Sequence, residues 1–217
     1  MIDVLIVGGT GVPYGESITD TFSRTLDHSR FAPRMVLYPA DYGLRVSYAE
    51  SSAAGKAALL SAISDSANRV VIAGYSQGAA IAGDVAAEIG RGLHPDLEVL
   101  ACALIADPLR PAGQCITRDP GDPITALPAG NPLRTVADLT QYFCISSPEA
   151  ALRWGQSLVD AVLHQRVQRW WAPKNWSAWS GALAYARGYL TDGRHTDDYV
   201  RQGHAALLAT IINREVA

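Results

Sequence analysis

Short, almost continuously apolar runs alternate with longer helical patterns along the first two thirds of this chain. A strand has this composition when helices cover both faces of its sheet, as in parallel sheets. The helical patterns fit that order, because residues 47–68 begin with a capping-box pair, Ser47 and Glu50, and residues 79–87 are rich in small side chains. The sequence therefore predicts an α/β fold with a central parallel sheet, whose strands are expected at residues 3–7, 35–38, 70–73, 99–106 and 142–145.

Length and composition exclude several classes of protein. The 217 residues correspond to one domain, residues 1–217, and a net charge of −3 gives no electrostatic basis for binding nucleic acid. No apolar run reaches the roughly 18 residues of a membrane span. The N-terminus enters a predicted strand without the basic segment of a signal peptide, so we expect synthesis in the cytoplasm without a signal peptide. Three cysteines, an odd number, do not indicate a disulfide framework.

The second half of the chain has a different character. Residues 108–132 contain six prolines and are expected to form a long loop, a kind of segment that is often functional. After Glu149 the pattern becomes helical again, and we interpret residues 150–190 as a helical insertion in the single domain. This insertion carries all five tryptophans, Trp154, Trp170, Trp171, Trp176 and Trp179.

The strongest candidate for a catalytic residue is Ser76. It lies in a Gly-x-Ser-x-Gly pattern, between the apolar run at residues 70–73 and the helix of small residues that follows. At a sharp strand-to-helix turn the serine hydroxyl is exposed, and Gly74 and Gly78 leave room where side chains would collide. The N-terminus of the following helix directs N–H groups toward a developing oxyanion. The pattern therefore favours a nucleophilic serine over an ordinary βα turn.

The stretch from Gly74 to Ala79, Gly-Tyr-Ser-Gln-Gly-Ala, resembles the nucleophile elbow of the cutinase-like serine esterases. That group includes cutinases, the PE-PPE esterase domains and the lysin B enzymes of mycobacteriophages. Three further stretches are similar to the group: Val-Gly-Gly-Thr-Gly at residues 7–11, Tyr-Pro-Ala at residues 38–40, and Ala-Asp-Pro-Leu-Arg-Pro at residues 106–111. The resemblance covers about the first 110 residues. It implies an α/β-hydrolase fold of the cutinase-like type, with an oxyanion hole formed by the Thr10 N–H and hydroxyl and the Gln77 N–H.

The glycine-rich loop after the first strand has an alternative interpretation. Gly9, Gly11 and Gly15 could approach a dinucleotide pyrophosphate, and Asp41 after the second strand could bind a ribose hydroxyl. Pro13 removes one N–H donor from such a loop, however, and the neighbouring tyrosine crowds the approach of a phosphate. The esterase interpretation is therefore favoured.

The candidate general base is His195. It lies in a polar turn between two helical stretches late in the chain, and the His-x-x-x-Tyr pattern there resembles the catalytic-histidine loop of lysin B and cutinases. His204 is a weaker candidate, expected in the following helix. His28, His94 and His164 have no suitable loop or position. An α/β-hydrolase presents its triad in the chain order Ser, acid, His, which His195 satisfies.

Two residues are candidates for the acid. Glu149 lies in the turn after the strand expected at residues 142–145, where relatives carry Gly-Asp. A glutamate is chemically acceptable, because the requirement is a carboxylate bonded to the histidine Nδ1. Asp138 precedes that strand and would lie at its wrong end. Glu149 is the favoured acid, with Asp138 as the alternative.

These residues predict a serine esterase that needs no cofactor and contains no metal site. A helical insertion before the histidine resembles the lysin B layout, which implies a phage lysis enzyme that cleaves the mycolic acid–arabinogalactan ester and is released to act on the host cell envelope. Trp171 and Trp176 are then expected to bind the acyl chain of this lipid ester, and the alternative is that the tryptophans form a small core within the insertion. The alternatives are a cutinase-like carboxylesterase or lipase, and a catalytically weak α/β-hydrolase scaffold that acts as a binding module. The oligomeric state stays open.

Overall fold

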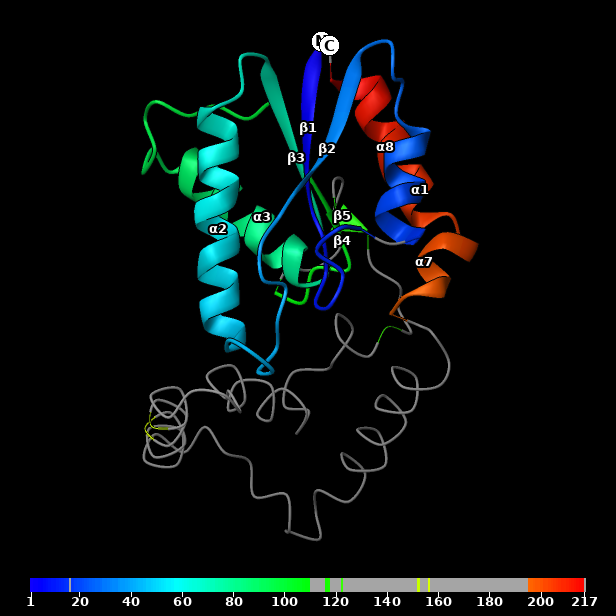
Figure 1. Cartoon of the computed structure of the whole chain (residues 1–217). Coiled ribbons are helices and arrows are strands. Elements are labelled where there is room, and N and C mark those ends of the chain that lie inside the picture. Colours follow the sequence, from blue (N-terminus) through cyan, green and yellow to red (C-terminus); the bar gives the residue numbers. More distant parts are fainter. Residues whose placement is uncertain are drawn as a thin grey trace, which may run out of the picture.

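A parallel sheet with helices on both faces forms the body of the protein (Figure 1). The computed structural model describes residues 1–15, 17–109, 116–117, 122, 152, 156 and 195–216. The strand order is β2-β1-β3-β4-β5, and each neighbouring pair is parallel. The predicted fold class is therefore confirmed, with strands β1 (Ile2–Val7), β2 (Phe31–Val36), β3 (Arg69–Tyr75), β4 (Ala101–Ile105) and β5 (Ile116–Thr117).

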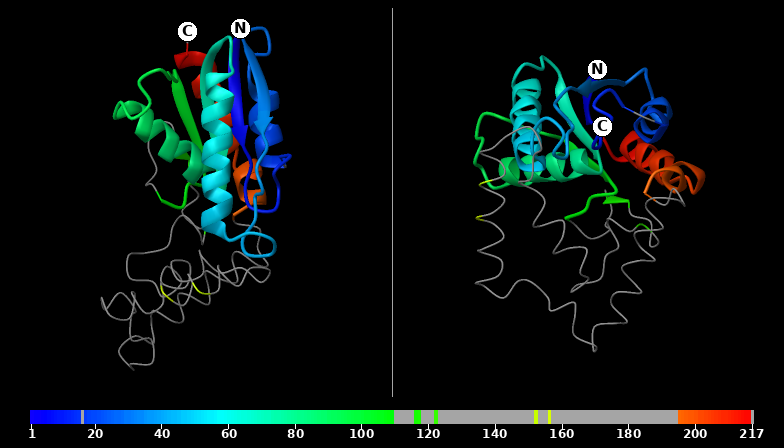
Figure 2. Two further views of the ribbon diagram at one scale, coloured as in Figure 1. Left: turned by 60° about the vertical axis from the view of Figure 1, so that its left-hand side comes forward. Right: turned by 60° about the horizontal axis from the view of Figure 1, so that its bottom comes forward.

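Two apolar cores lie on opposite faces of the sheet. The interior strand β1 contributes Ile2, Val4 and Ile6 to one core and Leu5 and Val7 to the other. Burial on both faces explains why the run is apolar without alternation. The first core is covered by α1 (Ser17–Thr25), α7 (Asp197–Arg201) and α8 (His204–Glu215), and the second by α2 (Tyr48–Ser64) and α3 (Gln77–Gly90) (Figure 2).

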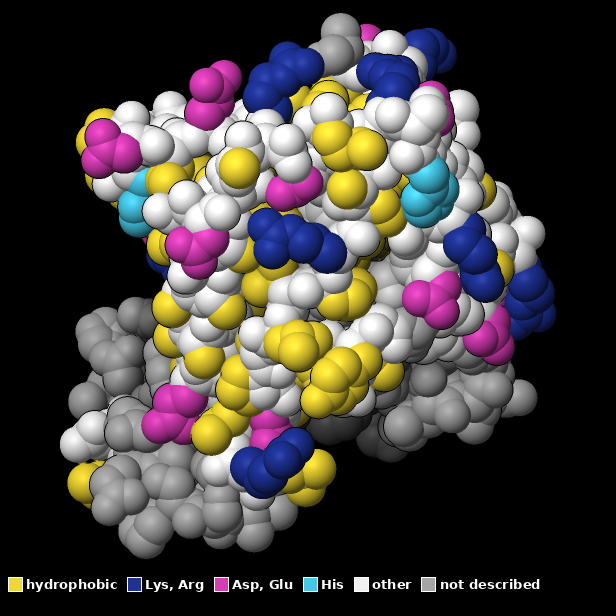
Figure 3. Space-filling model, turned by 45° about the horizontal axis from the view of Figure 1, so that its top comes forward, with side chains coloured by type: hydrophobic (Ala, Val, Ile, Leu, Met, Phe, Trp, Pro, Cys, Tyr) yellow, Lys and Arg dark blue, Asp and Glu magenta, His cyan; other side chains and the backbone are white. Residues whose placement is uncertain are grey.

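The loops that leave β1, β3 and β4 begin at one edge of the sheet. Val7 pairs with Gly74, and Gly74 pairs with Leu104, so the carboxyl ends of these strands lie at the same level. Both termini lie at the opposite end of the sheet (Figure 1). The face near the termini carries apolar, acidic and basic side chains interspersed (Figure 3). In an open parallel sheet, ligands bind beyond the carboxyl ends of the strands.

Two predicted elements differ from the structure. β2 covers residues 31–36 rather than 35–38, and it includes Pro33. A proline is tolerated there because β2 is an edge strand and one side of its backbone needs no ladder bond. The segment at 108–132 was expected to be a loop, but it contains the short strand β5, which extends the sheet beyond β4.

The capping box of α2 is confirmed. The Ser47 side chain accepts from the Glu50 N–H, and the Glu50 carboxylate accepts from the Ser47 N–H. The helix ends at Ser64, four residues before the predicted boundary. Among the residues that the structure describes, no helix is long and apolar enough to cross a membrane. The strand expected at residues 142–145 lies outside the described residues, and of the expected insertion at 150–190 only Leu152 and Gln156 are described, both helical and exposed.

Candidate active site

Ser76 occupies a strained turn between β3 and α3. Its φ of 54° and ψ of −118° lie where a residue with a Cβ is uncommon. The turn is held from both sides, because the Ser76 N–H donates to the Ile105 carbonyl at 3.0 Å and the Ser76 carbonyl accepts from the N–H groups of Ala79 and Ala80. This geometry presents the half-buried Ser76 side chain at the carboxyl edge of the sheet.

Glycine is required at three positions around this turn. A Cβ on Gly74 would overlap the backbone of Gly78, and a Cβ on Gly78 would overlap the carbonyl oxygen of Val7. A Cβ on Gly9 would lie 2.9 Å from the Tyr75 ring and 3.3 Å from the Cβ of Ser76. The loop after β1 therefore lies directly against the serine, as the resemblance to the cutinase-like esterases implies for this loop.

His195 lies within hydrogen-bond distance of Ser76. Its Nε2 is 2.8 Å from the Ser76 Oγ, and its Nδ1 is 2.9 Å from both carboxylate oxygens of Asp122. Because a carboxylate only accepts, Nδ1 carries the proton and Nε2 is free to accept from the serine hydroxyl. Asp122 is fully buried and the ring of His195 is almost so. The structure thus brings together a hydroxyl, an imidazole and a carboxylate in one hydrogen-bonded chain.

The residue on Nδ1 is not the one that the sequence analysis favoured. Asp122 fills the position expected for Glu149, so the assignment of that hydrogen bond is corrected to Asp122. Glu149 and the alternative, Asp138, lie outside the described residues. Asp122 was missed because it lies among prolines and glycines, in Asp-Pro-Gly-Asp-Pro at residues 119–123, which indicate a loop and give no strand from which to place a carboxylate. The chain order Ser, acid, His is compatible with Asp122 but also with the other acidic residues between Ser76 and His195.

Two buried tyrosines complete this cluster. The Tyr199 hydroxyl donates to Oδ2 of Asp122 at 2.7 Å, and the Tyr75 hydroxyl donates to the backbone carbonyl of His195 at 2.6 Å. The His195 ring lies 5.5 Å from the Tyr75 ring and 6.4 Å from the Tyr199 ring, which it meets at 81°. Tyr199 comes from α7, four residues after the histidine. Both residues of the His-x-x-x-Tyr pattern therefore bind the same carboxylate, that of Asp122.

The two predicted oxyanion residues contact each other. The Thr10 hydroxyl donates to Oε1 of Gln77 at 2.9 Å, and Nε2 of Gln77 donates to Ser52 on α2 at 3.1 Å. The Gln77 side chain is buried, so it links the loop after β1 to α2 from the inside. Gln77 is the first residue of α3, a position whose N–H has no acceptor within the helix. Since the Thr10 hydroxyl donates to Gln77, backbone N–H groups are the better donors for an oxyanion.

The loop after β2 supports the same region. The carbonyl of Ala40 accepts from the Gly11 N–H at 2.7 Å, and the Tyr38 hydroxyl donates to the Gly8 carbonyl at 2.7 Å. Burial raises the pKa of Tyr38 well above its ordinary value, so the phenol stays a donor. The Tyr-Pro-Ala stretch thus anchors the glycine-rich loop.

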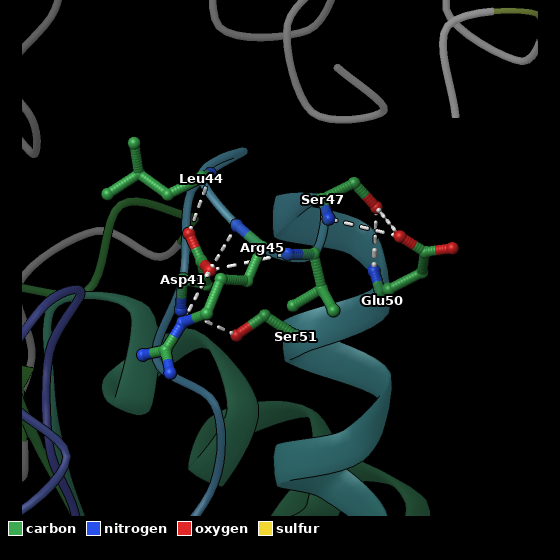
Figure 4. Close-up of polar contacts among 7 residues, drawn as sticks. Asp41, Leu44, Arg45, Ser47, Glu50 and Ser51 are labelled. Atoms are coloured by element: carbon green, nitrogen blue, oxygen red, sulfur yellow. Dashed lines mark hydrogen bonds and ion pairs between the residues drawn. The ribbon is translucent and has the colours of Figure 1, made fainter. Parts of the chain in front are cut away.

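Asp41 is used within its own loop, which argues against the dinucleotide interpretation. Its carboxylate accepts from the N–H groups of Leu44, Arg45 and Val46 at 2.7–3.2 Å, and its own N–H donates to Ser51 (Figure 4). Burial raises the pKa of this carboxyl, but the backbone N–H groups outweigh that effect and hold the pKa below its ordinary value. A carboxylate that already satisfies three backbone donors is poorly placed to bind a ribose hydroxyl.

The remaining candidates play other parts. His204 is the first residue of α8, and its ring lies 5.5 Å from that of Tyr199, whereas the histidine within hydrogen-bond distance of the Ser76 Oγ is His195. Within the described ranges, no group of three His, Cys, Asp or Glu side chains could hold a metal ion. Trp171 and Trp176 lie outside the described residues.

Comparison with known families shows to which family the chain belongs. The model of the PE-PPE domain matches residues 28–144, more than half of the chain. The chain belongs to the PE-PPE domain family. The matched part of this PE-PPE chain includes Ser76 and Asp122, while Thr10 and His195 lie on either side of it. The resemblance to a cutinase-like esterase group is thereby supported.

Individual relatives match this PE-PPE chain over part of its length. A carboxylesterase Culp6 homolog of Corynebacterium glutamicum is 39% identical over 111 residues, which are 50% of this chain and 34% of that protein. The chain thus spans about a third of the curated relative. A cutinase-like protein from Cryptococcus sp. is 25% identical with a TM-score of 0.41 over 52% of this chain and 56% of its own. An acetylxylan esterase is 24% identical with a TM-score of 0.43 over 73% and 91%.

Proposed function

We propose that this protein is a serine esterase that hydrolyses carboxylic esters. The observation that carries the proposal is the hydrogen-bonded chain from Asp122 through His195 to Ser76, on a strained strand-to-helix turn. This is the arrangement that nucleophilic catalysis by a serine requires. The family match and the name of the corynebacterial relative point to the same chemistry.

The proposed reaction uses each group at a stated atom. His195 accepts the Ser76 proton at Nε2 while the serine Oγ attacks the ester carbonyl carbon. The backbone N–H groups of Thr10 and Gln77 stabilise the oxyanion of the tetrahedral intermediate. The alcohol leaves with the proton from Nε2, and water, deprotonated by the same nitrogen, then hydrolyses the acyl-enzyme. Asp122 holds the tautomer of His195 and stabilises the imidazolium.

A narrower proposal concerns the substrate. The helical, tryptophan-rich sequence after Glu149 favours a lipid ester, and a layout similar to lysin B favours the mycolic ester of a mycobacterial-type cell envelope, cleaved by a phage lysis enzyme. A cutinase-like carboxylesterase acting on other lipid esters is the alternative, and the name of the corynebacterial relative favours it.

The test combines covalent labelling with hydrolysis. A fluorophosphonate probe should label the wild-type protein and fail to label Ser76→Ala, and p-nitrophenyl butyrate hydrolysis should fall to the background rate in that variant. Comparison of butyrate with palmitate esters and with purified mycolyl-arabinogalactan then separates the substrate classes. A folded wild-type protein that is not labelled would reject the esterase in favour of a binding module, and equal labelling of Ser76→Ala would move the nucleophile elsewhere.

A further inference from the structure

The hydroxyl of Tyr199 lies on the far side of Asp122 from the histidine. It donates to Oδ2 of Asp122 at 2.7 Å, while both carboxylate oxygens lie 2.9 Å from the Nδ1 of His195. Asp122 is fully buried, and so is Tyr199. A buried carboxylate is stable only when hydrogen bonds replace its lost hydration. The phenol is therefore one of the groups that make an ionised Asp122 tolerable at this position.

Tyr199 itself is held firmly by the fold. Its ring belongs to the apolar core between the sheet and α8, together with Ala205, Leu208 and Ile212. A fixed ring fixes the direction of its hydroxyl, and with it the orientation of the carboxylate that accepts from that hydroxyl. Because the ring also meets the His195 imidazole edge-on at 6.4 Å, one side chain contacts both the acid and the base.

We propose that Tyr199 is a positioning residue that acts on the reaction through Asp122, by holding the carboxylate ionised and aimed at the Nδ1 of His195. This inference depends on the proposed esterase function. In this proposal Tyr199 does not contact the substrate, and its effect reaches Ser76 through Asp122 and His195. Its hydroxyl sets the geometry of the acid, while its ring contributes to the core. Tyr75 provides a contrast, because its hydroxyl donates to the backbone carbonyl of His195 and so acts on the histidine directly rather than through Asp122.

The experiment is a double-mutant cycle on the rate constant for fluorophosphonate labelling and on ester hydrolysis. Tyr199→Phe keeps the ring and removes the hydroxyl, and it should lower both rates about tenfold with KM changed by less than about twofold. In an Asp122→Asn background the same substitution should change the rates by less than about twofold, since its effect passes through the carboxylate. Tyr75→Phe is the matched control, and its effect should persist in the Asp122→Asn background.

Three outcomes would overturn the inference. The first is an equal effect of Tyr199→Phe in the wild-type and Asp122→Asn backgrounds, and the second is an effect confined to KM. The third is a Tyr199→Phe protein that unfolds, because the hydroxyl would then be structural. A readout independent of activity separates this inference from the proposed function. The low-field proton signal of His195 Nδ1 should shift in Tyr199→Phe even if the wild-type protein proves inactive on every ester, and an unshifted signal would contradict the positioning role.

Discussion

The two halves of the candidate site are built by different physical means. The nucleophile half consists of Thr10, Ser76 and Gln77, which follow the ends of two adjacent strands, and its geometry comes from backbone strain and from glycines that no side chain could replace. The acid–base half consists of Asp122 and His195, which lie 73 residues apart and are joined by hydrogen bonds, with the hydroxyls of Tyr75 and Tyr199 as further donors.

The catalytic geometry of the candidate site therefore has two sources, steric restriction of the backbone and hydrogen bonds between distant segments. A strand-to-helix turn with a fixed φ is rigid because alternatives are sterically forbidden. A carboxylate and an imidazole from separate segments are aligned only as long as their hydrogen-bond partners stay in place. Substitutions of the glycines that shape the nucleophile half should therefore affect folding, whereas substitutions in the acid–base half should affect catalysis while the protein remains folded. Three substitutions test this contrast.

The largest effect is expected at Asp122. Asp122→Asn should lower kcat by about 10³–10⁴-fold, or roughly 4–5.5 kcal/mol of activation free energy, because the amide favours the wrong tautomer of His195. The melting temperature should change little. Glu149→Gln and Asp138→Asn are the matched controls and should retain kcat within a few-fold. Steady-state hydrolysis of p-nitrophenyl butyrate measures all three, and a large loss in Glu149→Gln with an active Asp122→Asn would return the acid to Glu149.

A smaller free-energy change, of a different kind, is expected at Gly78. Gly78→Ala places a methyl group against the carbonyl oxygen of Val7, so β1 and α3 must separate. The free energy of unfolding should fall by about 3 kcal/mol or more, measured by urea denaturation. Gly92→Ala is a reference, since a Cβ there meets open space and only the positive φ of 75° is unfavourable. A Gly78→Ala protein as stable as the wild type would refute the steric account of the elbow.

The smallest effect is expected at Asp41. This residue lies in the loop after β2, which contacts the glycine-rich loop of the nucleophile half, and its side chain holds that loop through hydrogen bonds. Asp41→Asn should lower the free energy of unfolding at pH 7 by roughly 1–2 kcal/mol, because backbone N–H groups lose a charged acceptor. The pKa of Asp41 is lowered in the folded state, so its contribution is present above the unfolded value of about 3.9 and is lost as the pH falls through the folded pKa. Denaturation of both proteins at pH 7 and pH 3 should therefore show a difference that shrinks at pH 3, and a constant difference would contradict this role.

Much of the nucleophile half was predictable from the sequence. Apolar runs fixed the central strands, and Gly74, Ser76 and Gly78 predicted the strained turn, because local sterics leave few alternatives for such a pattern. The capping pair Ser47 and Glu50 placed the start of α2 for the same local reason. The resemblance to cutinase-like esterases implied that Thr10 and Gln77 act together, and the structure joins their side chains by a hydrogen bond beyond the ends of the adjacent strands β1 and β3.

The acid was decided by tertiary structure alone. Asp122 lies in a proline-rich stretch with no periodic pattern, and nothing local distinguishes it from Asp107 or Asp119. It is the acid partner because the fold brings its carboxylate to the Nδ1 of His195 and the hydroxyl of Tyr199. The edge strand β2 gives a second case, since Pro33 is compatible with a strand only where one side of the backbone needs no partner. Local steric restrictions depend on residues that are neighbours in the sequence, whereas hydrogen bonds between distant segments form only when the chain has folded.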